Sequence, residues 1–510
     1  MVYNQLRTYR THIICVSGFF LLFLIFQFFG SHQILNGRQK SSPLPTPLHQ
    51  KESAIVHHAK PLKLDSAQDL TPESESQDLE SLLRGNEDEG WAQGPECAPY
   101  PRFEDLRFPN NPHFQLTQHD NLSYYLYGAY YDRRPRIAEV MVLAMVTTCE
   151  GPYPSTHLQM WFDGETVPEL VELHKTKLAW YKDWGSRPGM AYPTLLTFQV
   201  KSQRIPQLVS LVFGDPCAVP QNALRIAQPP APEPPNPGRP LRTGVCVKYL
   251  HFPDVDMSER FVEWLELLRL LGVERVFAYD IDALMPNTSR TLRHYTKSQG
   301  DGLLELRKFQ FHADTKENDR FQRVITEVLL YNDCFYRNLY DFDFLAVMDV
   351  DEVIMPVGSE HPTWPAMLEE LQSRDVNCTA RSSFCFRNVY FPKELPPPED
   401  SSVPQPFYML RHVVRVAEHL NPALAVKCLH NTGHVTLLHN HFALEWMEAC
   451  GPHDVLPDLG QLQHYRHVDN VKTLEEPPPQ RDGNIQRFQQ QLIHNALAVH
   501  RQLGWGLAAY

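Results

Sequence analysis

A short apolar run that ends in three carboxylates constrains this chain more than any other stretch. Phe344 to Met348 is uninterrupted hydrophobic sequence, too short for a buried helix and the right length for a strand covered on both faces. Asp349, Asp351 and Glu352 follow at once. In open α/β sheets, ligands bind beyond the carboxyl ends of the strands, so these acids are placed to meet a substrate. Two aspartates at this spacing can hold one divalent cation, and the cation can hold a diphosphate. A solvated acidic turn is the alternative.

Alternating strand and helix patterns around this run predict an α/β domain. Val245–Leu250 and Arg275–Asp280 are predicted strands that flank the helical pattern Glu259–Leu271, which makes a βαβ unit. A third strand is predicted at 303–311, and an amphipathic helix at 321–339 leads into the acidic run. We therefore expect a mostly parallel sheet flanked by helices.

Strand patterns also dominate residues 97–227, where we predict a small β-sandwich-like accessory module. The predicted strands are Glu139–Val146, Leu195–Val200 and Leu208–Phe213. Aromatic residues are frequent there, and they include Trp161, Trp180, Tyr181 and Trp184. Exposed Trp and Tyr side chains would suit stacking on sugars, but packing in a core explains the same residues. Seven of the twelve residues from Pro229 to Pro240 are proline, so we predict a stiff linker at 228–242.

The N-terminal sequence favours a membrane anchor. Residues 13–29 are almost wholly apolar, and at about 1.5 Å per residue they would span roughly 26 Å, close to a thin secretory bilayer. Arg7 and Arg10 precede this run, so the positive-inside rule predicts a cytosolic tail at 1–12 and a lumenal remainder. A cleaved signal peptide is the alternative. Residues 30–95 are rich in Ser, Pro, Gln and acidic residues, and we predict that they form a flexible lumenal stem.

Cysteine count, sequons and charge agree with a lumenal chain that does not bind nucleic acid. Ten cysteines include Cys15 in the predicted anchor, and the remaining nine are an odd number, so at least one is free or pairs between chains. Three glycosylation sequons lie on the predicted lumenal side, at Asn121, Asn287 and Asn377. The net charge is −13, and no stripe of Lys and Arg offers a surface for phosphates.

Several short motifs in the second half, taken in order, resemble glycosyltransferase family 92. They are Glu263-Trp264, Leu270-Leu271-Gly272-Val273, Asn332-Asp333-Cys334 and Asp349-Val350-Asp351-Glu352, with His464-Tyr465-Arg466 later. The resemblance covers residues 243–470 and implies a GT-A-like catalytic domain, which we place at 243–510. It further implies an inverting galactosyltransferase that uses Mn²⁺ and UDP-galactose. The implied product is a β-linkage, β-1,4 by expectation, to an N-glycan acceptor, with terminal galactose favoured over core fucose. A single-pass type II protein of the Golgi membrane is the implied setting.

The resemblance and the strand ends together nominate site residues. Asp349 and Asp351 are the expected metal ligands. Such enzymes often add a histidine from near the C-terminal end, and His430, His434, His439 and His441 crowd into twelve residues. His439 is our first choice, with His441 and His464 behind it, although a structural histidine explains each equally well. The expected donor-binding residues are Lys248, Tyr249, Asp280, Asn332, Arg337 and Glu352, each of which could instead be an ordinary surface or capping residue.

The catalytic base and two rival functions stay open at this point. An inverting transfer needs a carboxylate base near the acceptor hydroxyl. The candidates are Glu394, Glu399, Asp400 and Glu418, and nothing in the sequence ranks them. An apolar strand followed by Asp349-Val350-Asp351 also resembles the first motif of haloacid-dehalogenase-type phosphatases, although that motif normally opens its sheet. A non-enzymatic carbohydrate-binding protein of the lumen is the second rival.

Overall fold

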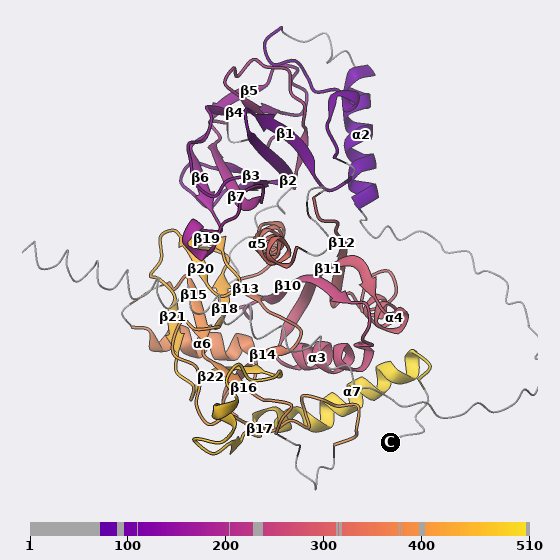
Figure 1. Ribbon diagram of the computed structural model, residues 1–510, viewed down its shortest axis with the longest axis vertical. Coiled ribbons are helices and arrows are strands. Elements are labelled where there is room, and N and C mark those ends of the chain that lie inside the picture. The colour runs from indigo at the N-terminus through magenta and orange to yellow at the C-terminus, as the bar shows by residue number, and fades with distance from the viewer. Residues whose placement is uncertain are drawn as a thin grey trace, which may run out of the picture. The chain divides into compact units, whose positions relative to one another are not determined.

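The computed structural model describes residues 72–505, except for 89–95, 110, 203, 228–237, 313–314, 316–318, 377, 379, 396 and 398–402. The predicted tail, the predicted anchor, the first part of the stem and most of the Pro-rich linker lie outside the described residues, as do Asn377, Glu399 and Asp400. No helix within the described ranges is long and apolar enough to cross a membrane. The fold of the described chain is mixed α/β with several sheets (Figure 1).

The central sheet has seven strands in the order β12-β11-β10-β13-β18-β15-β21. Its strands are β10 Thr243–Phe252, β11 Val273–Leu284, β12 Leu304–Lys308, β13 Phe344–Val347, β15 Ser383–Phe386, β18 Lys427–Asn431 and β21 His453–Val455. The four strands β12, β11, β10 and β13 run parallel, whereas β18 pairs antiparallel with both β13 and β15. Strands β15 and β21 are again parallel to each other, although no α-helix lies in the described chain between α6 (Trp364–Arg374) and α7 (Gln489–Gln502). Of the six neighbouring pairs in the sheet, four are therefore parallel and the two that involve β18 are antiparallel.

One face of the sheet carries the largest hydrophobic core. Helices α3 (Ser258–Leu270), α4 (Pro286–His294), α6 and α7 contribute side chains to this core together with the sheet strands. The predicted βαβ unit is present as β10-α3-β11, with parallel pairing between the two strands. The other short elements of this half are β14 Glu352–Pro356, β16 Asn388–Tyr390, β17 Val414–Arg415, β19 Val435–Leu438, β20 Ala443–Trp446, β22 Gly460–His464, β23 Gln480–Arg481, η5 Val471–Leu474 and η6 Asn484–Phe488.

Glu263, in the first of the recognised motifs, has a structural role. Its side chain is buried on α3 and accepts the backbone N–H groups of Tyr408 at 2.7 Å, Met409 at 3.0 Å and Leu410 at 2.8 Å. Burial raises the pKa of Glu263 to about 7, although the three N–H groups act in the opposite direction. The carboxylate therefore fastens a long loop of the second half to α3.

The strand-rich region is a nine-stranded sheet, in which eight strands follow the order β5-β4-β8-β9-β2-β3-β7-β6 and β1 pairs with β2. Its elements are η3 Phe103–Asp105, β1 Gln115–His119, β2 Leu122–Asp132, β3 Glu139–Val146, β4 Thr156–Trp161, β5 Glu169–Glu172, β6 Lys175–Leu178, η4 Lys182–Trp184, β7 Tyr192–Gln199, β8 Leu208–Phe213 and β9 Leu224–Ala227. Val142 of β3, Leu158 of β4 and Leu211 of β8 share one core, so the sheet doubles back on itself. All three strands predicted here are present, and the arrangement is one folded sheet.

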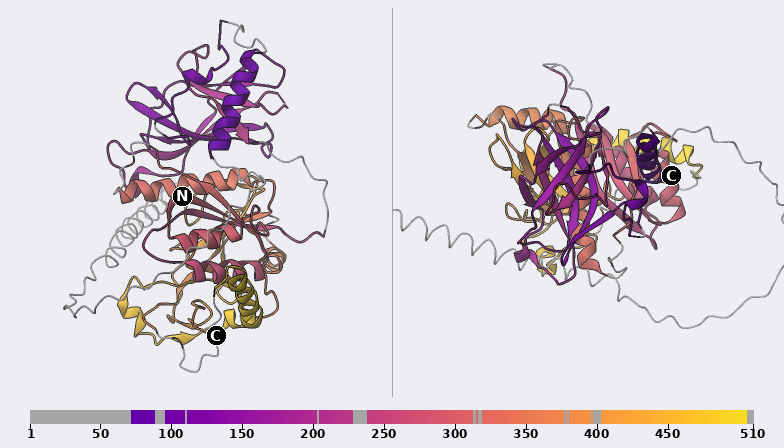
Figure 2. Two further views of the ribbon diagram at one scale, coloured as in Figure 1. Left: turned by 90° about the vertical axis from the view of Figure 1, so that its right-hand side faces the viewer. Right: turned by 90° about the horizontal axis from the view of Figure 1, so that it is seen from above.

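Helix α5 (Arg320–Arg337) lies between the strand-rich sheet and the central sheet (Figures 1 and 2). It contacts β10 below and β7, β3 and β2 above. Its Asp333 carboxylate accepts hydrogen bonds from Tyr279 of β11 at 2.6 Å and from Tyr130 of β2. The amide of Gln322 pairs with the backbone of Ala191 through two bonds of 2.8 and 3.0 Å. These buried polar contacts join the strand-rich region to the central sheet through one helix.

A helix occupies part of the stretch that we predicted to be a flexible stem. Helix α2 (Pro72–Asp88) packs Leu79 and Leu83 against Tyr100, Trp161 and Leu208. These two leucines lie four residues apart, which places them on one face of a helix. The overall composition of 30–95 predicted a flexible segment, but this apolar pair packs on a hydrophobic surface of the strand-rich region and stabilises a helix there.

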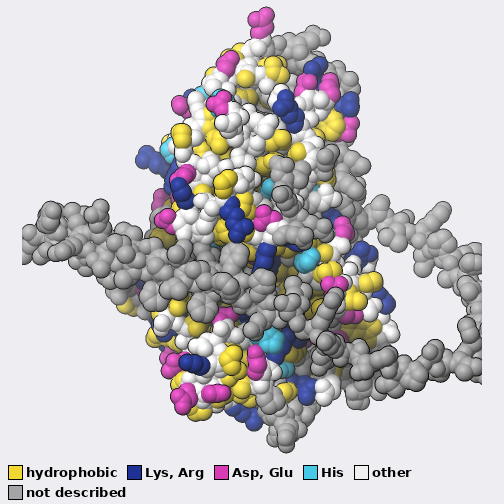
Figure 3. Space-filling model, in the orientation of Figure 1, with side chains coloured by type: hydrophobic (Ala, Val, Ile, Leu, Met, Phe, Trp, Pro, Cys, Tyr) yellow, Lys and Arg dark blue, Asp and Glu magenta, His cyan; other side chains and the backbone are white. Residues whose placement is uncertain are grey.

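Four disulfides are present, and they fit the predicted oxidising compartment. They join Cys97 to Cys217, Cys246 to Cys334, Cys378 to Cys450 and Cys385 to Cys428. Cys149 is the free cysteine of the described chain, which accounts for the odd number. On the face shown in Figure 3, basic and acidic side chains are interspersed.

His312 is a buried titratable group that should make the fold sensitive to acid. Its ring stacks on Tyr125 of β2 at 4.6 Å, and neither ring nitrogen has a hydrogen-bond partner among the described residues. Burial lowers the pKa of His312 to about 4. The unfolded chain binds a proton near pH 6.5 while the folded chain stays neutral, so acidification from pH 6.5 to 4 should cost about 3 kcal/mol.

We expect His312→Phe to flatten this loss, because phenylalanine keeps the ring packing and cannot take up a proton. Urea unfolding midpoints at pH 7 and pH 5 measure the effect, and His494→Gln on the exposed part of α7 is the control. The wild type and the control should lose about 2 kcal/mol more than His312→Phe between these values. Equal losses in all three proteins would contradict the assignment.

Candidate active site

The acidic residues form a tight turn that joins β13 to β14 (Glu352–Pro356). The Glu352 carboxylate accepts the backbone N–H of Asp349 at 3.0 Å, and the N–H of Glu352 donates to the Asp349 carbonyl at 3.2 Å. The indole N–H of Trp264 on α3 donates to the Glu352 carbonyl at 2.9 Å. These three bonds hold the turn directly beyond the carboxyl end of a fully buried strand, as predicted.

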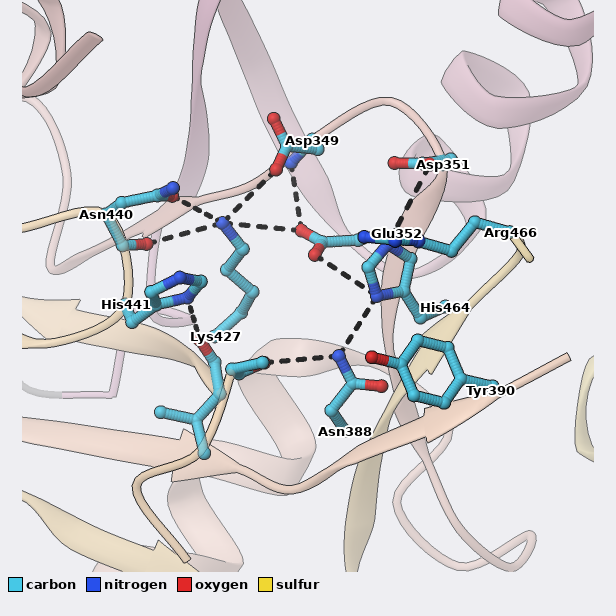
Figure 4. Close-up of polar contacts among 12 residues, drawn as sticks. Asp349, Asp351, Glu352, Asn388, Tyr390, Lys427, Asn440, His441, His464 and Arg466 are labelled. Atoms are coloured by element: carbon cyan, nitrogen blue, oxygen red, sulfur yellow. Dashed lines mark hydrogen bonds and ion pairs between the residues drawn. The ribbon is translucent and has the colours of Figure 1, made fainter. Parts of the chain in front are cut away.

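Two lysines flank Asp349 (Figure 4 shows Lys427). Lys427 begins β18 and is fully buried, and its Nζ lies 3.4 Å from Asp349 Oδ2 and 3.5 Å from Glu352 Oε2. It also donates to the Asn440 side-chain oxygen at 2.6 Å. Lys248 Nζ lies 3.0 Å from Asp349 Oδ1 and 3.2 Å from Glu327 Oε1 of α5. Each oxygen of the Asp349 carboxylate is therefore within ion-pair distance of an ammonium group.

A bulge in β10 explains why Lys248 reaches the turn. Cys246 pairs with Phe277 of β11 and Tyr249 pairs with Tyr279, so two residues of β10 stand opposite one residue of β11. Such bulges bend a strand and re-aim its side chains, and they are common beside active sites. Lys248 is one of the two bulged residues, and 32% of its side chain stays exposed.

A second, small sheet brings His464 to the turn. Its order is β14-β22-β16, with β22 at Gly460–His464 and β16 at Asn388–Tyr390. The register pairs Glu352 with His464 and His464 with Tyr390. His464 Nε2 lies 3.7 Å from Asp351 Oδ2, and its Nδ1 lies 3.7 Å from Glu352 Oε1 and 3.0 Å from Asn388 Nδ2 (Figure 4). The imidazole therefore sits between the two carboxylates that follow Asp349.

For most of these groups, neighbouring charges shift the pKa more than burial does. Burial alone would raise the pKa of Asp349, but Lys248 and Lys427 hold it well below its ordinary value. Burial would likewise raise the pKa of Asp351, and its interaction with His464 lowers it instead. Burial would lower the pKa of His464, but Glu352 and Asp351 raise it. Glu352 is the exception, since burial raises its pKa despite Lys427 and His464. The site is a compact array of opposite charges at one strand end.

Asp351 and His464 are the residues here whose side chains suit a divalent metal ion. The Asp351 side chain is 36% exposed and faces His464, and Mn²⁺ accepts both carboxylate and imidazole ligands. Asp349 would need its lysines to move before it could join them. In the described part of the chain, no three His, Cys, Asp or Glu side chains are grouped as they would be around a bound metal. Asp351 and His464 could therefore supply two ligands of such an ion, and His464 would first have to lose the proton that Glu352 and Asp351 stabilise.

The histidine cluster of the sequence serves other purposes. His439 is buried among aromatic rings, with its centroid 4.7 Å from Trp184 and 5.3 Å from Phe442. It is not among the side chains that contact Asp349 or Asp351 in the described structure. His441 Nδ1 donates to the carbonyl of Val426 at 3.1 Å. His464, the third choice, is the histidine that the structure brings to the carboxylates.

Of the predicted donor-binding residues, Lys248 and Glu352 belong to the site and four others have separate contacts. Asn332 exchanges two hydrogen bonds with the backbone of Leu438, which fixes β19 on α5. Asp280, which we predicted to end its strand, lies inside β11 and is paired with Lys308, the last residue of β12, at 2.8 Å. The ring of Tyr249 lies 5.0 Å from that of Phe311.

Arg337 lies away from the acidic turn. Its guanidinium is 2.8 Å from Asp333, and with Arg307 and Lys308 it lines a separate cavity of about 380 Å³. That cavity opens among β2, β9, β12 and α5, and none of its lining residues belongs to the acidic turn. A role for Arg337 in donor binding therefore has no support in the arrangement of side chains.

Two of the four candidate bases are described. Glu394 follows β16 and lies 2.8 Å from His467 Nδ1, which follows β22. Lys393 beside it is within electrostatic range of both Glu394 and Asp351. Glu418 is exposed beyond β17. Glu394 is therefore the described candidate that shares surroundings with the acidic turn.

Sequence reasoning missed Lys427, Glu327, Asn440 and Asn388. Lys427 and Glu327 each carry a signal, because a charged residue inside an apolar pattern must have a partner when it is buried. Lys427 is followed directly by the apolar residues Cys428 and Leu429. Glu327 lies on the buried side of a helix that the sequence predicted correctly. The two asparagines carry no comparable signal, since their contacts depend on strand register.

Comparison with known proteins agrees with this site. A sequence search against curated proteins gives no match. The model of glycosyltransferase family 92 matches residues 242–501, which is 260 of the 510 residues and includes every side chain of the array described above. The resemblance carried by the acidic turn and its companion motifs is thereby confirmed. The chain belongs to glycosyltransferase family 92.

Proposed function

We propose that this protein transfers galactose from UDP-galactose to a glycan acceptor, with inversion to a β-linkage. Family membership supports a sugar donor and a glycan acceptor. The choice of galactose, the β-1,4 linkage and the preference for a terminal galactose of an N-glycan over core fucose rest on the resemblance of the motifs. The GT-A character of the catalytic domain rests on the same resemblance, and the four neighbouring parallel strands β12, β11, β10 and β13 are compatible with it.

The observation that carries the proposal is the array at the end of β13. Asp351 and His464 would hold Mn²⁺, and such an ion stabilises the leaving diphosphate as a Lewis acid. Lys248 is partly exposed at its bulge and would bind phosphate oxygens beside Asp349. Lys427 is fully buried, so we assign it to holding the acidic turn in place.

The acceptor hydroxyl needs a proton acceptor, and Glu394 is the first residue to test. It is partly exposed, hydrogen-bonded to His467, and near Asp351 through Lys393. A carboxylate in such a position can take the proton as the acceptor oxygen attacks the sugar.

We further propose that the chain is a type II protein of the Golgi membrane with its catalytic region in the lumen. The apolar run at 13–29 and the basic residues before it support this placement. The four disulfides support the lumenal side. The phosphatase rival is less well supported, because β10, β11 and β12 precede β13 in the same sheet and the family model names a transferase.

The test follows UDP release by a secreted form of residues 70–510. A panel of UDP-sugars is offered with galactosylated and core-fucosylated N-glycans, with and without Mn²⁺. We expect turnover of UDP-galactose that needs both the metal and an acceptor, and mass spectrometry of the product identifies the acceptor sugar. Turnover of another donor would overturn the galactose assignment. A folded protein that turns over no donor but hydrolyses a phosphate ester would overturn the transferase.

A further inference from the structure

The structure separates the aromatic residues of the strand-rich region into two groups. Trp161 and Trp180 are 0% and 2% exposed and belong to the core. Tyr181 is 40% exposed, and Trp184 is half-buried. Among the described residues, Tyr181 and Trp446 are the aromatic side chains that stand out as exposed. Tyr181 and Trp184, which we call the aromatic ledge, are therefore available for contacts outside the core.

The aromatic ledge is rigid. The ring centroids of Tyr181 and Trp184 are 4.8 Å apart at 72°, an edge-to-face pair. The 3-10 turn between them is closed by the N–H of Trp184, which donates to the Tyr181 carbonyl at 3.0 Å. The indole N–H of Trp180 donates to the Gly185 carbonyl at 2.9 Å, which anchors the turn to the core. A ligand would meet rings whose orientation is already fixed, so little entropy is lost on contact.

A chain of contacts through buried side chains links the ledge to the catalytic array. Trp184 packs on His439 at 4.7 Å, Asn440 is the next residue, and the Asn440 side-chain oxygen accepts a hydrogen bond from Lys427 at 2.6 Å. Lys427 in turn contacts Asp349. Ion pairs from Lys175 and Lys177 of β6 to Glu445 of β20 hold the strand-rich region against the same hairpin.

The strand order places the ledge and Lys248 on opposite sides of β13. Lys248, which we assign to the donor phosphates, belongs to β10, on one side of β13 in the sheet. Strand β18 lies on the other side, and the ledge is reached through Lys427 of β18 and the segment that follows β19. A donor sugar held at Asp351 would therefore face an acceptor that arrives from the β18 side.

We propose that the aromatic ledge is a saccharide subsite, which binds acceptor sugar units beyond the one that receives galactose. The inference rests on the function proposed above. The C–H groups on one face of a pyranose ring pack on the negative face of an aromatic ring, and neighbouring polar groups can bind the hydroxyls. Glu445 lies near the Tyr181 hydroxyl, and Lys182 is exposed beside it. Because several contacts separate the ledge from Asp349, it would bind extended glycans and leave single sugars untouched.

The test compares acceptors of different length in Tyr181→Ala, Tyr181→Phe and a matched control. The control is Trp446→Ala, since Trp446 is 39% exposed and its ring lies against Gly451 instead of His439. We expect Tyr181→Ala to raise KM for an extended galactosylated N-glycan about tenfold, with KM for UDP-galactose and for methyl β-galactoside unchanged. Tyr181→Phe keeps the ring and should behave as the wild type, as should Trp446→Ala.

Two results would overturn the subsite. One is an unchanged KM for the extended acceptor in Tyr181→Ala. The other is an equal rise for the single sugar and the extended glycan, which would show that the ledge acts on the reacting centre. Calorimetric titration of the extended glycan without donor separates this inference from the proposed function. If the wild type turns over no donor yet binds the glycan about tenfold more tightly than Tyr181→Ala, the subsite stands and the transferase fails.

Discussion

Replacing Asp351 with asparagine is expected to lower the rate of sugar transfer about a thousand-fold. Asp351 is the most exposed carboxylate of the acidic turn, and it is the one that faces His464 at 3.7 Å. Asparagine keeps the size and removes the charge that would hold the metal ion beside the leaving diphosphate. The measurement is kcat for UDP-galactose over a range of Mn²⁺ concentrations, together with the unfolding midpoint.

The fold should survive this substitution, because the Asp351 side chain is partly exposed and its loss leaves no buried charge without a partner. Asp282→Asn is the matched control: Asp282 lies in β11 of the same sheet, pairs with Lys308 and is 73% exposed. It should retain full activity. If Asp351→Asn kept more than about a tenth of the wild-type rate, Asp351 would not be a ligand of a catalytic ion.

Replacing Lys427 with methionine is expected to destabilise the fold by about 3–5 kcal/mol. Lys427 is fully buried, and its ammonium group lies within ion-pair distance of two carboxylates, those of Asp349 and of the buried Glu352. Methionine fills the space but leaves Glu352 without that positive charge, and removal of one partner from a buried ion pair is costly. The measurement is the urea midpoint of the wild type and the variant at pH 7.

Two further variants make this expectation specific. Lys248→Met removes the other ammonium group beside Asp349 and the partner of the buried Glu327 carboxylate. Lys248 is 32% exposed and Asp349 keeps Lys427, so a loss of about 2 kcal/mol, smaller than that of Lys427→Met, is expected. In the double variant Lys427→Met/Glu352→Gln the buried charge is removed together with its partner. The double variant should therefore be less destabilised than the sum of the single variants, by at least about 1 kcal/mol. Strict additivity would show that Lys427 and Glu352 do not interact.

Local pattern determined much of the architecture and part of the site. The apolar run from Phe344 to Met348 predicted β13, and the alternation of strands and helices before it predicted the β10-α3-β11 unit. Asp349 and Asp351 could be placed beyond a strand end because they follow the run in sequence. Such features are properties of contiguous residues, where spacing alone decides which side chains are buried.

The tertiary structure alone decided which distant residues meet the acidic turn. Lys427 is 78 residues from Asp349 and arrives through the antiparallel pairing of Ala346 with Leu429. His464 arrives through the pairing of β14 with β22, whereas His439, the choice made from sequence, is turned toward Trp184. A shift of one residue in either register would turn these side chains to the opposite face. Register between strands far apart in sequence is set by the packing of the whole core, so local sequence pattern cannot predict it.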